Sequence, residues 1–224
     1  MSKYFPPVEE ADSDGLLAVG GALTPERIAD AYTHGIFPWP QSEYFPVLWF
    51  SPDPRAILPL DSAHFSRRLM RTIRSQGWIF SIDKAFEAVI RGCAAPREDK
   101  SGTWITKSMI SAYCNLHQLG IAHSFEVWRF NPDCPPKAAN EENLELIGGV
   151  YGLAFNRFFA GESMFHTQTD ASKAALWFLV ETLKENEFLL FDLQVINSHT
   201  QQFGTIEIPR SEYLRRLDEA LKMP

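Results

Sequence analysis

The amino-acid sequence predicts an α/β (α+β) fold in two parts, a small loop-rich N-terminal domain over residues 1–62 and a larger domain over residues 63–224. Glycine and proline make up thirteen of the first sixty residues, so long helices and strands cannot form there. Beyond residue 62, helix and strand periodicities alternate along the chain, which predicts a mixed sheet flanked by helices on both faces. The 224 residues are 45% hydrophobic, enough for one core or two small ones.

Local signals give the elements in chain order. In the first domain, Thr24 suits the N-cap of a helix, Pro25 its first position and Gly35 its end. Further periodicities predict helices from Ser62 or His64 to about Gln76, over 84–93, from Thr106 to Gly120, from Asp170 through Leu183 and from about Ser211. They predict strands over 78–82, 123–130, 145–155, 157–161 and 188–195. The polar, acidic stretch 131–143 predicts a surface loop.

Composition excludes several classes of protein. No run approaches the roughly 18 to 20 uncharged residues that cross a bilayer, and the first residues lack the basic and apolar regions of an export signal, so we expect a cytoplasmic protein without a membrane partner. Cys93, Cys114 and Cys134 have no metal-ligand or CxxC spacing, which predicts reduced thiols. The six histidines are scattered, and we expect neither a bound metal nor a cofactor.

Charge is distributed unevenly along the chain. The net charge is −7, but residues 1–62 contribute −6, residues 63–129 contribute +5 and residues 130–224 contribute −6. A basic middle between acidic ends is typical of a protein that binds a polyanion on one face, although uneven charge without a function fits as well. Four arginines follow one predicted helix, and they indicate either phosphate recognition or a solvated helix face. These arginines are Arg67, Arg68, Arg71 and Arg74.

The sequence lacks the motifs of several common enzymes, namely the dinucleotide GxGxxG, the GxxxxGK phosphate loop, HExxH and GxSxG. What remains are polar residues in apolar strands. Asp192 and Gln194 alternate in FLLFDLQV, so strand geometry predicts that they share one face, and Glu162 follows Gly161 in another apolar strand. Such groups are costly to bury unless they are paired, so they indicate either a reacting centre or a structural hydrogen-bond network.

Two further patterns indicate either a ligand or packing. Gly148, Gly149 and Gly152 lie in one predicted strand, where glycine often marks a bulge or the close approach of another backbone or a ligand. Aromatic residues lie between prolines in GIFPWP (35–40) and LWFSPDPR (48–55) and offer rigid stacking surfaces. Trp49 could hold a base or an apolar side chain there, or belong to the core.

Several segments between residues 15 and 216 match one known family. They are GLLAVGGALTPERIADAYTHGIFPWP, WFSPDPRAILP, GTWITKSMISAYCNLHQLGIAHSFEVW, GGVYGLAFNRFFAGESMF, ASKAAL and DLQVINSHTQQFGTIEIPRSEYL. Together these segments closely resemble the leucyl/phenylalanyl-tRNA-protein transferases of bacteria. Long motifs in a fixed order are far more specific than any short pattern.

The resemblance implies an activity and a fold. Members of this family transfer leucine or phenylalanine from its tRNA to the N-terminal arginine or lysine of a protein, which marks that protein for the N-degron pathway. We therefore expect an aminoacyltransferase, with methionine as a third candidate amino acid, that works as a monomer. The implied fold is a small N-terminal domain joined to a larger domain resembling the GCN5-related acetyltransferases.

The resemblance also implies roles for particular residues. The catalytic residues that it implies are Asp192, Gln194 and Glu162. The residues implied to frame the terminal adenosine and the aminoacyl pocket are Trp49, Trp104, Tyr113, Val150, Phe159, Leu176, Leu179, Leu183 and Phe191. The four arginines named above fall where the family has a basic helix that meets the acceptor stem of the tRNA.

Our hypothesis for the mechanism is that the enzyme acts mainly by positioning an already activated ester against an amine. Gln194 would accept a hydrogen bond from the attacking amine and Asp192 would orient Gln194, so both side chains should face outward into a cavity. Three alternatives stay open. They are another aminoacyl-tRNA-dependent transferase, a CoA-dependent acetyltransferase, whose pyrophosphate loop is missing here, and a tRNA-binding module without catalysis.

Overall fold

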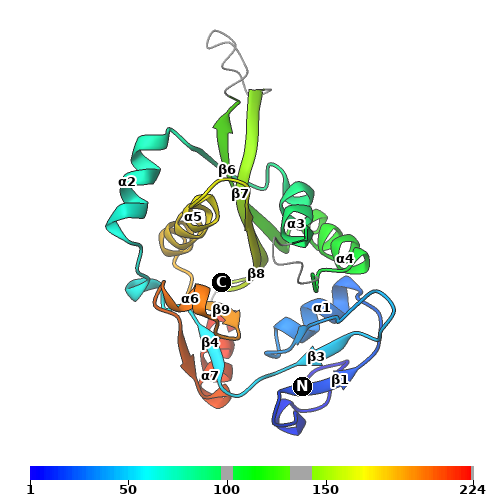
Figure 1. Cartoon of the computed structure of the whole chain (residues 1–224). Coiled ribbons are helices and arrows are strands. Elements are labelled where there is room, and N and C mark those ends of the chain that lie inside the picture. Colours follow the sequence, from blue (N-terminus) through cyan, green and yellow to red (C-terminus); the bar gives the residue numbers. More distant parts are fainter. Residues whose placement is uncertain (97–102, 132–142, 223–224) are drawn as a thin grey trace.

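A computed structural model describes residues 1–96, 103–131 and 143–222, and it confirms the mixed α/β architecture with a distinct N-terminal part (Figure 1). The strands form two sheets, a three-stranded sheet in the order β1-β3-β2 and a seven-stranded sheet in the order β10-β4-β9-β8-β7-β6-β5. The predicted surface loop 131–143 lies outside the described residues except for its two end residues, and so does Cys134.

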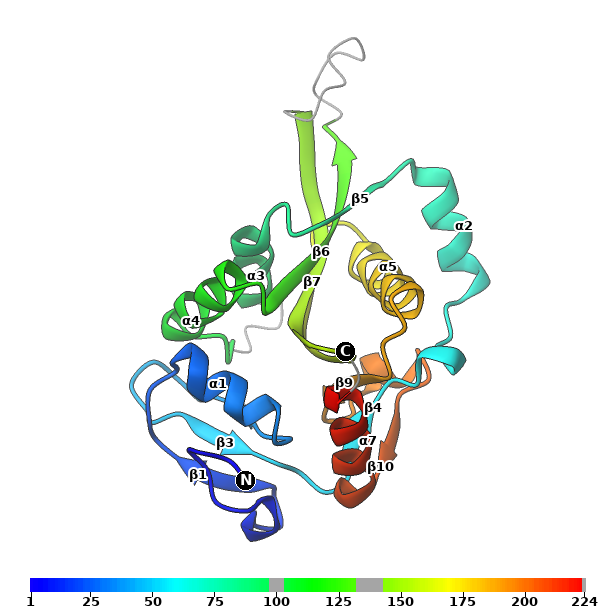
Figure 2. The ribbon, with the colours of Figure 1, turned by 180° about the vertical axis from the view of Figure 1, so that it is seen from behind.

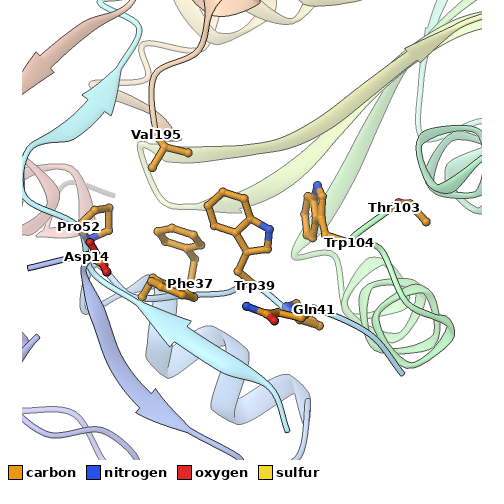
Figure 3. A pocket seen from close by; sticks show the side chains of 10 residues that line it. Asp14, Phe37, Trp39, Gln41, Pro52, Thr103, Trp104 and Val195 are labelled. Carbon is orange, nitrogen blue, oxygen red and sulfur yellow. The ribbon is translucent and has the colours of Figure 1, made fainter. Parts of the chain in front are cut away.

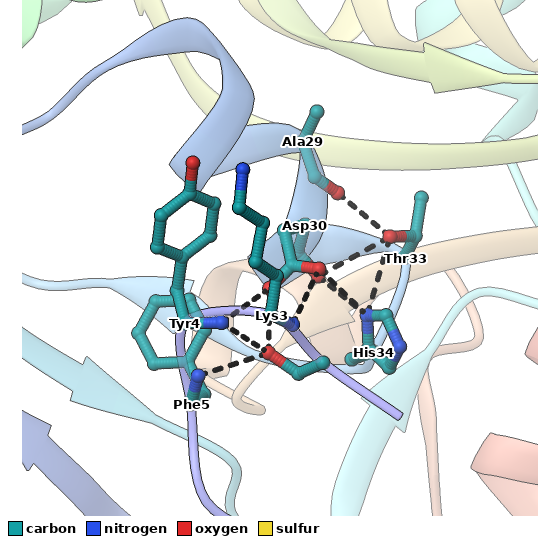
Figure 4. Close-up of polar contacts among 8 residues, drawn as sticks. Lys3, Tyr4, Phe5, Ala29, Asp30, Thr33 and His34 are labelled. Atoms are coloured by element: carbon teal, nitrogen blue, oxygen red, sulfur yellow. Dashed lines mark hydrogen bonds and ion pairs between the residues drawn. The ribbon is translucent and has the colours of Figure 1, made fainter.

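The N-terminal part carries the small sheet. Its elements are the 3-10 helix η1 (Val8–Glu10), strand β1 (Leu16–Val19), helix α1 (Pro25–Tyr32), and strands β2 (Phe37–Pro38) and β3 (Leu48–Phe50). The start of the chain is tied to α1 through Asp30, whose carboxylate accepts the Ser2 hydroxyl at 2.5 Å and the backbone N–H groups of Lys3 and Tyr4 at 3.2 and 3.3 Å (Figure 4). These bonds hold the first residues against the helix.

The large sheet is antiparallel except at one pair of strands. Its strands are β4 (Arg55–Ile57), β5 (Ile79–Ile82), β6 (Ala122–Phe130), β7 (Leu144–Phe155), β8 (Phe158–His166), β9 (Leu190–Gln194) and β10 (Ile206–Ile208). Only β8 and β9 run parallel among these pairs. Strand β4 precedes residue 62 yet pairs with β9 and β10, so the chain enters the large sheet before the predicted domain boundary. The boundary itself remains a prediction.

Helices cover both faces of the large sheet. They are α2 (Arg67–Gln76), α3 (Phe86–Ala94), α4 (Lys107–Gln118), α5 (Ala171–Glu185), α6 (Ser198–Gln201) and α7 (Arg210–Lys222). Both views show α5 on one side of β6 and β7, and α3 and α4 on the other (Figures 1 and 2). Two apolar clusters follow this division, one beneath α1, α3 and α4 and one beneath α2 and α5.

The glycines of β7 are explained by this packing rather than by a ligand. A Cβ added at Gly148 would lie 2.8 Å from the Cβ of Ala171 at the start of α5. A Cβ at Gly152 would lie 2.2 Å from the carbonyl oxygen of Ala160 in β8, next to an irregularity in the β7–β8 pairing. Both positions therefore require the absence of a side chain because a neighbouring element lies too close.

Local signals located most helices well. The hydroxyl of Thr24 accepts the N–H of Arg27 at 3.3 Å and that of Thr106 accepts the N–H of Met109 at 3.2 Å, as predicted for N-caps. The predicted start of the second helix at Ser62 or His64 was wrong. Leu60–Ser62 forms a 3-10 turn, and α2 begins at Arg67 with the hydroxyl of Ser66 as its cap.

Other local predictions need correction. Asp170 occupies the N-cap position of α5 as predicted, but its side chain makes no capping hydrogen bond. Its carboxylate instead pairs with Arg68 at 3.3 Å and Lys173 at 3.4 Å. The short elements α6 and β10 were not predicted at all. Within the described residues Cys93 is buried, Cys114 is half-buried and neither forms a disulfide.

Candidate active site

A buried ion pair connects two neighbouring strands of the large sheet, β4 and β9. The guanidinium of Arg55 donates from Nε to Oδ1 of Asp192 at 2.9 Å and from Nη2 to Oδ2 at 2.7 Å. The hydroxyl of Tyr213 donates to the same carboxylate at 3.0 Å, and Arg55 also donates to the carbonyl of Gly35 at 3.0 Å. Both charged side chains are at most 1% exposed. Burying two charges is costly unless they are well paired, and here each guanidinium nitrogen and each carboxylate oxygen has a hydrogen-bond partner.

The expectation that Asp192 faces outward was wrong. Its side chain is 0% exposed and is bonded to Arg55 and Tyr213 inside the sheet. It acts on Gln194 through the backbone, because Oδ1 accepts the Gln194 N–H at 2.9 Å. Gln194 has a left-handed backbone (φ 58°), so strand alternation stops there and the two side chains need not share a face.

The side chain of Gln194 reaches Glu162. Its Nε2 lies 3.3 Å from Oε1 of Glu162 in β8. Two tyrosine hydroxyls complete the group, since Tyr32 donates to Oε1 at 2.6 Å and Tyr113 lies 3.2 Å from Oε2. The two hydroxyls are 2.8 Å apart. We call Glu162, Gln194, Tyr32 and Tyr113 the polar cluster.

The polar cluster contains a carboxyl group that titrates near neutral pH. Burial raises the pKa of Glu162 from 4.5 to about 7, against the opposing effect of hydrogen bonds from Tyr32 and Tyr113; the negative charge of Asp192 raises it further. Since the amide nitrogen of Gln194 is engaged by Glu162, its amide oxygen is left as an acceptor. The cluster can therefore hold an amine and exchange a proton near pH 7.

The structure also has an aromatic hollow of about 500 Å³, and Figure 3 shows its lining side chains. We call it the aromatic hollow, and its lining residues are Asp14, Phe37, Trp39, Pro40, Gln41, Phe50, Pro52, Thr103, Trp104 and Val195. Val195 follows Gln194 directly in the chain, but none of the four residues of the polar cluster lines the hollow. The rings of Trp39 and Trp104 meet edge to face at 6.5 Å, and Trp39 is 38% exposed.

The structure separates the aromatic residues predicted for substrate binding. Trp104 lines the hollow, whereas Trp49 is 0% exposed, packs on Phe5 at 4.7 Å and donates its indole N–H to the carbonyl of Gly20 at 3.0 Å. Trp49 is therefore a core residue, and the prediction that it frames a base was wrong. Tyr113 is also fully buried and contacts Glu162. Trp39 also lines the hollow and was not among the predicted residues, although its segment GIFPWP already carried the aromatic and proline signal.

The residues predicted for the aminoacyl pocket lie together in the cluster beneath α5. They are Val150, Phe159, Leu176, Leu179, Leu183 and Phe191, and none is more than 4% exposed. None of them lines the aromatic hollow or the hollow on α2 described next. Met164 and Leu193 lie half-buried at the margin of the cluster. That these residues receive a substrate side chain remains a prediction.

The arginines of α2 also separate into two sets. Arg67, Arg71 and Arg74 are exposed and line a second hollow of about 540 Å³ with Phe65, Met70 and Ser75. Arg68 is turned toward Asp170. All four arginines of the predicted cationic face are exposed, and three of them line this hollow. Across the described ranges, no three His, Cys, Asp or Glu side chains gather as a metal site, and no helix is long and apolar enough to cross a membrane.

The α/β fold, the polar cluster of a carboxyl group and a fixed amide, and the arginine-rich helix suit a transferase, and the comparisons with known proteins specify which class of transferase this is. A family model described as leucyl/phenylalanyl-tRNA protein transferase matches residues 57–218, and its N-terminal domain model matches residues 21–53. The chain belongs to the leucyl/phenylalanyl-tRNA-protein transferase family and is an aminoacyltransferase.

Curated relatives match over nearly the whole chain. A leucyl/phenylalanyl-tRNA–protein transferase of Shewanella pealeana is 47% identical over 95% of this chain and 85% of that protein. The corresponding transferase of Idiomarina loihiensis is 47% identical over 98% of this chain and 89% of that protein. Among solved structures, the crystal structure of FemX aligns with a TM-score of 0.51 and 11% identity, covering 83% of this chain and 66% of that chain. This last likeness concerns the fold alone.

Proposed function

We propose that the protein transfers leucine or phenylalanine, and also methionine, from aminoacyl-tRNA to the α-amino group of proteins that begin with arginine or lysine. The product is a new peptide bond and an N-degron. The observation that carries this proposal is the position of Gln194, whose amide is fixed by Glu162 and whose neighbour Val195 lines the aromatic hollow. The site for the amine of the acceptor protein would thus lie next to the site for the aminoacyl-tRNA.

The aminoacyl-tRNA would be held at two points. The terminal adenosine suits the edge-to-face pair Trp39 and Trp104, because every base offers a face for stacking. The phosphates of the acceptor stem suit the exposed guanidiniums of Arg67, Arg71 and Arg74. In this proposal Trp39 takes the part that sequence comparison had given to Trp49.

The reaction requires no strong base. An α-amino group with a pKa of about 7.7 to 8.0 loses its proton near pH 7.4 at a cost of only about 0.7 kcal/mol. The neutral amine attacks the ester carbonyl, a C–N bond forms, the C–O bond to the ribose breaks, and one amine proton passes to the ribose oxygen through the substrate or water. The amide oxygen of Gln194 would accept a hydrogen bond from the amine, and Asp192 is a positioning residue that holds the Gln194 backbone.

Side-chain selection belongs to the apolar cluster beneath α5. We propose that the aminoacyl side chain enters at its margin, near Met164 and Leu193, and contacts the six predicted residues Val150, Phe159, Leu176, Leu179, Leu183 and Phe191. A substrate shorter by a methylene loses about 1 to 3 kcal/mol in such a site, so valine should be disfavoured rather than rejected. We further propose that the protein acts as a monomer. Its location would be the cytoplasm, where aminoacyl-tRNA is made.

The test is direct transfer. The protein is incubated with leucyl-, phenylalanyl- or methionyl-tRNA and a peptide that begins with arginine, and the peptide is weighed by mass spectrometry. We expect a gain of one aminoacyl residue, none when the peptide is N-acetylated, and loss of kcat in Gln194→Leu. Gln118→Leu, which alters an exposed glutamine on α4, is the matched control. No transfer from any of the three tRNAs would refute the proposal.

A further inference from the structure

The aromatic hollow has two chemically different ends. Figure 3 shows Trp39 and Trp104 at one end and Asp14 beside Pro52 at the other, with Val195 above the Asp14 end. Asp14 is the only acidic residue among the ten that line the hollow. The tryptophan end suits a base, whereas the Asp14 end joins a carboxylate to apolar walls, so the proposed adenosine accounts for only part of the hollow.

The loop that carries Asp14 is held in place by hydrogen bonds from its backbone to a side chain and by close packing on Pro52. The Asp12 carboxylate accepts the N–H groups of Asp14 and Leu16, both at 2.9 Å. Gly15 has φ 83°, and a Cβ there would lie 2.6 Å from the Cα of Pro52, so the loop packs directly on the wall of the hollow. Asp14 is therefore presented by a fixed turn rather than by a long flexible side chain.

The Asp14 carboxylate is exposed, and no ion pair occupies it within residues 1–96, 103–131 and 143–222. The cation beside this wall is Arg210, whose guanidinium donates to the carbonyl of Ser51 at 2.6 Å. An exposed carboxylate at the end of an apolar channel suits a side chain with an aliphatic stem and a cationic head. Phe37, Phe50 and Pro52 would contact the stem.

We infer that Asp14 recognises the basic side chain of the first residue of the acceptor protein. This inference rests on the proposed function and adds a specificity-determining residue to it. With the adenosine at the tryptophan end, the acceptor amine lies near Gln194 and Val195, and its side chain extends along Phe37 and Phe50 to Asp14. Arginine and lysine both reach a carboxylate in this way, which accounts for a preference shared by two side chains of different shape.

The test compares acceptor peptides in steady-state kinetics. The peptides begin with arginine, lysine or citrulline, the neutral isostere of arginine, and the enzyme variants are Asp14→Asn and the control Glu10→Gln, which removes an exposed carboxylate of η1 outside the hollow. We expect Asp14→Asn to raise KM about two- to fivefold for the arginine and lysine peptides, as for an exposed ion pair. The KM for the citrulline peptide, the KM for aminoacyl-tRNA and kcat should not change.

Salt provides a second measurement. The KM of the unaltered enzyme for the arginine peptide should rise between 50 and 500 mM salt and become independent of salt in Asp14→Asn, because screening acts on the exposed pair. Asp14→Ser repeats the measurement with a smaller side chain in case the first variant folds poorly. Equal losses for arginine and citrulline peptides, or an unchanged KM for arginine, would overturn the inference. Absence of transfer by the unaltered enzyme would instead overturn the proposed function.

Discussion

Two tryptophans ten residues apart should respond in opposite ways to the same substitution. Trp39 lines the aromatic hollow, is 38% exposed and meets Trp104 at 6.5 Å, whereas Trp49 is 0% exposed and bonded to the Gly20 carbonyl. Trp39→Ala should weaken binding of the tRNA 3′ end by about 1 to 3 kcal/mol, the usual range for one stacked base, which is about 5- to 150-fold in Kd. Stability should change little.

Trp49→Ala should act on stability instead. Removing a fully buried indole costs about 3 to 5 kcal/mol, and leaving the Gly20 carbonyl without its donor adds about 1 to 3 kcal/mol. The total is a large fraction of the roughly 5 to 15 kcal/mol that separates folded from unfolded domains. Affinity for the tRNA end should be unchanged in whatever fraction of the variant is folded.

The assay measures both quantities on both variants. Urea unfolding followed by circular dichroism gives the free energy of unfolding, and isothermal titration calorimetry at 10 °C with a non-hydrolysable aminoacyl-adenosine gives Kd. Phe130→Ala, at an exposed aromatic residue of β6 outside the hollow, is the control for loss of an aromatic ring. The reasoning fails if Trp49→Ala weakens binding as much as Trp39→Ala does, or if Trp39→Ala is the variant that unfolds.

Three further predictions concern charge. Asp192→Asn leaves Arg55 buried without a counter-charge, so the urea midpoint should fall by an amount worth about 3 to 5 kcal/mol; a loss below about 1 kcal/mol would mean that the pair is hydrated. Arg71→Glu with Arg74→Glu should weaken tRNA binding and reduce the slope of log K against log salt by about 2, and an unchanged slope would remove α2 from the interface. Because the folded Glu162 keeps its proton up to about pH 7 and the unfolded one only to about 4.5, the free energy of unfolding should fall as pH rises through this window, and Glu162→Gln should flatten that dependence in urea midpoints measured at pH 5 and pH 8.

The burial of Asp192 shows that Asp192 and Gln194 do not form one pair of outward-facing groups. Polar residues two apart in a strand suggested a pair of groups facing the substrate. In the structure the pair divides its tasks, since Asp192 joins Arg55 and Tyr213 inside the sheet while Gln194 turns toward Glu162. The left-handed backbone at Gln194 makes this possible, and no periodicity in the sequence reports such a residue.

Some parts of the site could be predicted and others could not. The arginine row of α2 follows from helical spacing alone, and all four of its members are exposed as expected. Which of them line the second hollow depended on tertiary structure, because Arg68 pairs with Asp170 at the start of another helix. The choice between Trp39 and Trp49 likewise depended on packing, because both lie in segments with the same aromatic and proline composition.

Short-range patterns in the chain were enough to specify the local features, namely the caps at Thr24 and Thr106, the amphipathic faces of the helices and the family motifs. These depend on residues within a few positions of one another. Tertiary structure alone decided the pairing of Arg55 with Asp192, 137 residues apart, and the donation from Tyr32 to Glu162, 130 residues apart. Such contacts depend on how whole elements pack. A buried charge or hydroxyl is destabilising unless it has a partner, and only the packing of distant elements decides which partner lies within hydrogen-bonding distance.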